Sequence, residues 1–190
     1  MIIDYLKEKD YTIKHYSKNK TLFKEGNKCH SLGIVLNGEI KISTYSLNGK
    51  EIIYSIIKDN QMFGNNLLFS SEKLFKGDVI ATKDSDIAFI EKDKLLDLLY
   101  KNKNFMLAFL EYNSNSMKEL NTKIKILSLD SIYDRFMYYL HINNNQIKYS
   151  SITELSSILN VARESMSRLI HKLEKEKVIS IKNNIISAIN

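Results

Sequence analysis

The pattern of apolar residues changes once along this 190-residue chain, and that change limits the folds it can adopt. Up to about residue 90, short runs rich in Ile, Val and Tyr are separated by turn signals, including Asn37-Gly38 and Asn48-Gly49. Asn-Gly between such runs favours a β-hairpin, so we expect a meandering antiparallel barrel or jelly roll. The apolar residues that follow recur with the period of a helix. Further strands are expected at 20–23, 79–81 and 87–90.

A long helix is expected after a short apolar one that contains Leu95 and Leu99. Its apolar residues recur at alternating spacings of four and three, which is typical of a helix that packs along a second helix. This seam consists of Met106, Leu110, Asn113, Met117, Leu120, Ile124 and Leu127. We interpret it as the contact of a homodimer in which Asn113 fixes the register. Packing of the seam against the β region of the same chain is the alternative.

The last third of the chain predicts a helix-turn-helix unit with flanking strands. Helices are expected at 131–141 and 152–159, and Ser151 followed by Glu154 is a capping box at the start of the second. Asn160-Val161 then breaks the helix before another begins. This spacing is typical of a unit whose second helix enters the major groove of DNA. Strands on both sides of residues 183–184, and a third at 146–149, predict a wing.

The helix that begins at Arg163 has two distinct faces. Its apolar stripe, at positions i, i+3, i+4 and i+7, consists of Met166, Leu169, Ile170 and Leu173. Its polar face consists of Arg163, Glu164, Ser167 and Arg168. An ordinary solvated surface would look the same, but the preceding helix and turn favour a DNA-binding surface.

Composition excludes several other classes of protein. The formal charge of +6 and the pI near 9.1 are compatible with a nucleic-acid partner. The single cysteine, Cys29, predicts no internal disulfide, and the scattered histidines predict no metal site or other cofactor. A barrel enzyme such as a cupin needs clustered metal ligands, so we expect no enzyme activity. No apolar run reaches about 18 residues and the first residues do not resemble a secretory signal, so we expect a cytoplasmic protein without a membrane partner.

Four motifs resemble the Crp/Fnr family of bacterial transcription regulators. They are LFKEG (22–26), GIVLNGEIKI (33–42), MFGN (62–65) and VARESMSRLIHKLEKEKVI (161–179). The resemblance implies an α+β chain with a cyclic-nucleotide-binding-like β-barrel sensor domain (1–100), a dimerisation helix (101–128) and a winged helix-turn-helix domain (129–190). The family usually has Gly where this chain has Asn160. Because Asn tolerates a left-handed backbone, we expect the turn to be kept.

The resemblance also implies roles for individual residues. Arg163 and Arg168 would donate to guanine, Glu164 would accept from cytosine, and Ser167 would pair with either kind of group. Ser151, His171 and Lys172 would contact phosphates, although His171 is equally interpretable as a solvated surface residue. The implied partner is double-stranded DNA that carries inverted repeats with a TGA core, and RNA polymerase is a further candidate partner.

The sensor region departs from the family pattern at its ligand positions, which are Gly64, Asn65, Phe75 and Lys76. Family members that bind cyclic AMP have Glu where this chain has Asn65, and an Arg-Ser pair where it has Phe75 and Lys76. We therefore expect that cyclic AMP is not the effector. One alternative is an activator that depends on a cyclic nucleotide or another small ligand in a divergent pocket. Another is a dimeric sensor without DNA binding, against which the RExxSR pattern argues.

Overall fold

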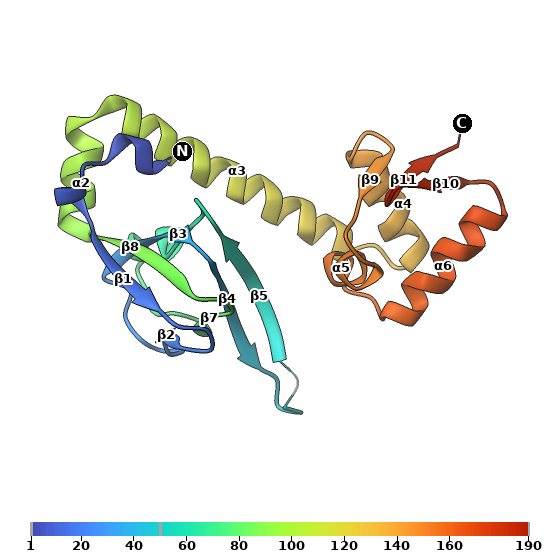
Figure 1. Cartoon of the computed structure of the whole chain (residues 1–190), viewed down its shortest axis with the longest axis horizontal. Coiled ribbons are helices and arrows are strands. Elements are labelled where there is room, and N and C mark those ends of the chain that lie inside the picture. Colours follow the sequence, from blue (N-terminus) through green and yellow to red (C-terminus); the bar gives the residue numbers. More distant parts are fainter. Residues whose placement is uncertain (1, 50, 190) are drawn as a thin grey trace. The chain divides into compact units, whose positions relative to one another are not determined.

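The chain folds into two units that divide between Asn115 and Ser116, inside its longest helix (Figure 1). The computed structural model describes residues 2–49 and 51–189. The order of antiparallel strands, long helix and further helices agrees with the fold class expected from the sequence. The long helix is α3 (Lys103–Leu127), and it contributes Phe105 and Phe109 to the first core and Ile126 to the second.

The first unit is built on two antiparallel sheets of four strands each, in the orders β1-β8-β3-β6 and β2-β7-β4-β5. The strands are β1 (Thr12–Tyr16), β2 (Thr21–Phe23), β3 (Ser31–Asn37), β4 (Glu39–Tyr45), β5 (Glu51–Lys58), β6 (Met62–Phe63), β7 (Asp78–Ala81) and β8 (Ser85–Glu91). The helices are two 3₁₀ turns (Ile2–Tyr5 and Glu8–Asp10), the short α1 (Asn65–Leu68) and α2 (Lys92–Lys101). Strands β3 and β8 are buried over most of their length, because α1 packs on β3 and α2 packs on both.

The two Asn-Gly pairs have different roles. Asn48-Gly49 lies in the hairpin between β4 and β5, where Gly49 has a φ of 73° and donates to Ser46 O at 2.9 Å. Asn37-Gly38 does not form the expected hairpin, because β3 and β4 belong to different sheets. A Cβ on Gly38 would lie 2.2 Å from the Ser85 hydroxyl oxygen, and its φ is 104°. Gly38 therefore turns the chain from one sheet to the other, where a side chain would clash.

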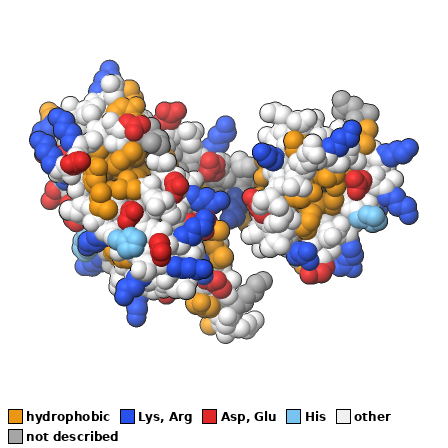
Figure 2. All heavy atoms as spheres, viewed as in Figure 1, with side chains coloured by type: hydrophobic (Ala, Val, Ile, Leu, Met, Phe, Trp, Pro, Cys, Tyr) orange, Lys and Arg blue, Asp and Glu red, His pale blue; other side chains and the backbone are white. Residues whose placement is uncertain are grey.

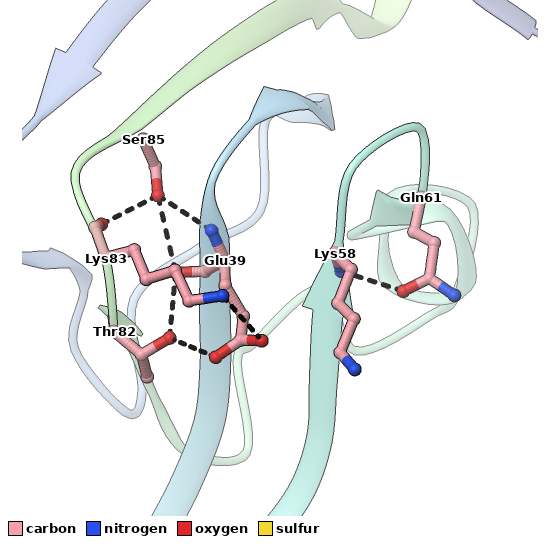
Figure 3. A network of polar contacts seen from close by, with 6 residues as sticks. All are labelled: Glu39, Lys58, Gln61, Thr82, Lys83 and Ser85. Atoms are coloured by element: carbon pink, nitrogen blue, oxygen red, sulfur yellow. Dashed lines mark hydrogen bonds and ion pairs between the residues drawn. The ribbon is translucent and has the colours of Figure 1, made fainter. Parts of the chain in front are cut away.

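A polar network around Glu39 stabilises this corner (Figure 3). The Thr82 hydroxyl donates to the Glu39 carboxylate at 2.7 Å, and Lys83 Nζ lies 3.7 Å from its other oxygen. The Glu39 backbone N–H donates to the Ser85 hydroxyl at 3.0 Å, and this hydroxyl lies 2.8 Å from Lys83 O. The network joins β4 to the β7–β8 turn, so Glu39 has its partners within the chain.

The second unit contains the end of α3, three helices and a three-stranded sheet of order β10-β11-β9. The elements are α4 (Ile132–Ile142), β9 (Gln146–Lys148), α5 (Ile152–Ile158), α6 (Arg163–Lys175), β10 (Ile179–Lys182) and β11 (Ile185–Ala188). Asn183 and Asn184 both have positive φ, as a tight hairpin between β10 and β11 requires. Phe136, Leu155, Leu159, Met166 and Ile186 lie in one core with no exposed surface. The predicted three-stranded sheet is confirmed.

Candidate nucleic-acid interface

Helices α5 and α6 contact each other and are joined by a short turn whose hydrogen bonds are made within the chain. Val161 N donates to Ser156 O at 2.9 Å, and Asn160 N donates to Ser157 O at 3.2 Å. Asn160 has a φ of 51°, so it adopts the left-handed conformation expected from the sequence. The turn is therefore compatible with Asn where a glycine would be the easier choice.

The start of α5 differs in one detail from the expected capping box. Ser151 Oγ accepts from Glu154 N at 3.1 Å, as the motif requires. The Glu154 carboxylate, however, accepts from the backbone N–H and hydroxyl of Ser150, at 2.8 and 2.6 Å. Ser150, and not the capping residue Ser151, therefore donates to the Glu154 carboxylate. The sequence did not identify Ser150.

The polar face of α6 is exposed while its apolar stripe is buried. Met166, Ile170 and Leu173 face the core of the second unit, and Leu169 is partly buried. All four residues of the predicted reading face, Arg163, Glu164, Ser167 and Arg168, are exposed. Figure 2 shows Lys and Arg side chains along the outer edge of this unit, where Figure 1 places α6. The core contacts thus fix which side of the helix faces outward.

The two arginines of this face have no acidic partner in the described part of the chain, residues 2–49 and 51–189. Arg168 Nε donates to Glu164 O at 3.3 Å, which uses one of its five donors. The side chain of Arg168 is exposed, so its remaining donors are open to solvent. Arg163, about one turn earlier on the helix, is exposed as well. Both guanidinium groups therefore have capacity to bind an external acceptor.

The three residues predicted to contact phosphate lie in different settings. Ser151 is exposed and its hydroxyl caps α5. Lys172 and His171 are both exposed on α6, and Lys172 Nζ lies 3.9 Å from the Glu176 carboxylate. An exposed ion pair at this distance contributes at most about 1 kcal/mol, so a phosphate can compete with it.

The seam of α3 is largely open in the single chain. Leu110, Met117, Leu120 and Ile124 are exposed, each by more than half of its surface. Met106, Asn113 and Leu127 are partly buried. A row of exposed large apolar side chains on one helix is costly in water and is typical of a surface that another helix covers.

Two of the four ligand positions in the sensor region are used for packing and surface charge. Phe75 is 2% exposed, and its ring stacks on Phe23 with centroids 4.8 Å apart. Lys76 is 62% exposed, and its Nζ pairs with Glu72 at 2.6 Å. An aromatic ring in the core cannot hold a phosphate, and the exposed Lys76 offers a single point charge without the planar fork of an arginine.

The other two ligand positions contact their own chain. Gly64 has a φ of 79°, and a Cβ there would lie 3.0 Å from the Cys29 sulfur. Asn65 Nδ2 donates to Asn113 Oδ1 at 2.8 Å, which joins α1 to α3. Tyr112, the residue before Asn113, receives the Met62 N–H on its hydroxyl at 2.8 Å. The first half of α3 is therefore held by the same short segment that would contact a ligand.

The sequence comparisons agree with this arrangement. Residues 13–102 match the family model of the cyclic nucleotide-binding domain. The chain is 25% identical to an anaerobic regulatory protein of Bacillus subtilis, over 90% of this chain and 76% of that protein. It is 22% identical to the cAMP-activated global transcriptional regulator CRP of Pasteurella multocida, over 88% of this chain and 85% of that protein. Over most of its length the chain is therefore similar to Crp/Fnr transcription regulators.

Solved structures of similar fold match almost the whole chain. A CooA mutant from Carboxydothermus hydrogenoformans matches with a TM-score of 0.71 and 15% identity, over 98% of this chain and 89% of that one. A CprK complex matches with a TM-score of 0.75 and 13% identity, over 96% and 88%. These similarities show a shared fold, and they agree with the resemblance to Crp/Fnr regulators that the four motifs indicate.

The described residues offer little to a metal ion. In the described residues, no cluster of three or more His, Cys, Asp or Glu side chains is placed to bind a metal ion. Burial raises the pKa of the Cys29 thiol, which favours its protonated form over a metal-binding thiolate. None of the described helices is long and apolar enough to cross a membrane.

Proposed function

We propose that the protein is a homodimeric transcription regulator that reads specific DNA sequences through helix α6 and does not use cyclic AMP. The observation that carries the proposal is the exposed set of Arg163, Glu164, Ser167 and Arg168 on the second helix of a helix-turn-helix unit. The relatives named as transcription regulators support the general function. RNA polymerase is a candidate partner, and the cytoplasm is the expected location.

The chemistry of the reading face supports base recognition. A guanidinium presents two parallel donors that fit the O6 and N7 acceptors of guanine, and a carboxylate accepts from the N4 amino group of cytosine. Arg163 and Arg168 supply the donors and Glu164 the acceptor, from neighbouring turns of one helix. We propose half-sites with a TGA core, and phosphate contacts from Ser151, Lys172 and His171 to set the register.

The exposed seam of α3 supports a dimer. A second copy placed along Leu110, Met117, Leu120 and Ile124 would remove these side chains from water, at about 25 cal/mol per Å² of apolar surface buried. Two recognition helices would then meet an inverted repeat with half-site centres about 34 Å apart. In this proposal residues 1–100 form the sensor domain, 101–128 the dimer helix and 129–190 the DNA-binding domain.

The contacts of Asn65 and Phe75 support a regulator without cyclic AMP. A buried cyclic phosphate needs strong donors to offset the loss of its hydration, and Phe75 has none. Asn65 already binds Asn113, so the segment is joined to α3 by contacts within the chain. A different small ligand in a divergent pocket is the second candidate, and it is favoured only if specific DNA binding requires an added molecule.

Selection from random duplex DNA tests the proposal. The purified full-length protein, with no ligand added, should enrich an inverted repeat with fixed G·C positions in each half-site. A gel shift on the enriched duplex should become weaker as salt rises, because phosphate contacts release bound cations. Enrichment of no sequence, with or without cyclic nucleotides, would contradict the DNA-binding proposal.

A further inference from the structure

One arginine of the second unit contacts two separate segments of the backbone. Arg135 lies near the start of α4 and is partly buried. Its Nε donates to Leu129 O at 2.9 Å, and its Nη2 donates to Leu127 O at 3.3 Å. Its Nη1 donates to the carbonyls of Leu159 and Asn160, at 3.4 and 3.5 Å. The sequence alone did not indicate this residue.

The contact with Leu127 satisfies a carbonyl group at the C-terminal end of α3. The last four carbonyl groups of a helix have no partner within it. Three of those in α3 accept from Ser128 and Leu129, at 2.8–3.2 Å. The fourth, that of Leu127, accepts from Arg135. Without the guanidinium this partly buried carbonyl would lose its partner in the described structure.

The remaining contacts hold the turn before α6. The carbonyls of Leu159 and Asn160 lie where α5 ends, at the negative end of its dipole. One cation thus lies near the C-terminal ends of both α3 and α5. A lysine could not replace it, because an ammonium has no planar fork that reaches several carbonyls at fixed angles.

We propose that Arg135 is a positioning residue for DNA binding, because it fixes the helix-turn-helix turn to the end of the dimer helix. In a dimer this contact sets the separation and angle of the two recognition helices. The inference rests on the proposed function, since it assigns Arg135 a role in the spacing of half-sites. Arg135 is not expected to contact DNA.

The test compares operators of different spacing. One base pair added at the centre of the selected repeat moves the half-sites apart by about 3.4 Å and rotates them by about 35°. We expect the wild type to lose about tenfold or more in affinity on that operator, and the Arg135→Met variant to lose less than about threefold. Arg135→Lys keeps the charge without the fork and should behave like Arg135→Met. The matched control is Lys148→Met, an exposed cation on β9 that should keep the wild-type ratio.

A purely structural role for Arg135 predicts a different result. It would lower the melting temperature and weaken every operator by the same factor, so the ratio between spacings would stay at the wild-type value. An unchanged ratio in both Arg135→Met and Arg135→Lys would overturn the proposal.

Hydrogen exchange separates this inference from the proposed function. In the full-length Arg135→Met variant, the amides of Leu129, Asn160 and Val161 should exchange faster, while those of Met166 and Ile170 stay protected. If the wild type selects no duplex, the proposed function fails. The exchange data alone then show whether Arg135 holds the two backbone segments together. Unchanged exchange at these three amides would show that Arg135 does not hold the segments together.

Discussion

The reading face of α6 and the ligand positions of the sensor unit differ in how their polar groups are used. Arg163 and Arg168 are exposed and have no described carboxylate as a partner, on a helix whose apolar side packs against the core. At the ligand positions, Phe75 is in the core and Asn65 binds Asn113. The reading face leaves its charged groups exposed to solvent. The ligand positions use their side chains in contacts within the chain.

Under the proposed function, the family fold keeps one of its sites while the other is altered. The β sheets and α3 need only their apolar core to form, so a ligand position can be replaced by a core side chain such as Phe75 without loss of the fold. The reading face contributes little to stability, so its exposed charged residues favour a role in binding. Fold similarity therefore supports DNA binding and ligand binding unequally in this chain.

The largest expected effect concerns α3, the helix that joins the two copies in the proposed dimer. Leu120→Glu combined with Ile124→Glu should give a folded monomer, because both side chains are more than half exposed in the single chain. Operator affinity should fall more than about a hundredfold as the second half-site contact is lost. Light scattering and gel shifts measure the two effects.

The control for this variant is Lys118→Gln with Lys123→Gln, which changes two exposed residues outside the seam and lowers the net charge by the same two units. It should remain dimeric. A monomeric double seam variant that binds the operator as tightly as the wild type would show that α3 does not support DNA binding.

The next effect tests the reading face directly. Arg168→Ala or Arg163→Ala should cost about 1–3 kcal/mol per half-site and relax the preference at one G·C pair. Lys172→Ala should instead weaken all sequences alike and reduce the salt dependence, because it removes a phosphate contact. Binding constants on a panel of single-base operator variants distinguish these outcomes. Equal losses on all duplexes for Arg168→Ala would assign that arginine to the backbone instead.

A smaller effect is expected where the sensor segment joins α3. Tyr112→Phe removes the hydroxyl that receives the Met62 N–H at 2.8 Å, so it should lower the free energy of unfolding by about 1 kcal/mol. Tyr11→Phe is the control, since it removes a phenolic hydroxyl elsewhere in the same unit. Urea denaturation of the full chain measures both. An unchanged free energy for Tyr112→Phe would mean that the hydroxyl does not help to hold the segment.

Much of this arrangement could be predicted because local patterns determine it. The two faces of α6 follow from helical spacing, and the left-handed Asn160 follows from its position in the turn. The role of Gly38 was predicted wrongly, because an Asn-Gly pair does not reveal that Ser85, 47 positions later, lies against it. Two further sets of contacts were missed for the same reason, those of Arg135 with the backbone and the one between Asn65 and Asn113. They join residues distant in sequence, and only the packed core brings them together.

The smallest expected effect is that of cyclic AMP, for which we predict no change in melting temperature at millimolar concentration. A ligand at a hundredfold excess over its dissociation constant would stabilise the protein by about 2.7 kcal/mol, which corresponds to a shift of about 5–10 °C. The buried ring of Phe75 offers no donor to the phosphate, and Lys76 is paired with Glu72 at the surface. Differential scanning calorimetry with cyclic AMP and cyclic GMP provides the measurement, and a cyclic AMP-dependent CRP serves as the positive control. A clear upward shift together with tighter operator binding would mean that the first unit binds cyclic AMP through contacts other than those of the family. The contrast between the two regions would then no longer hold.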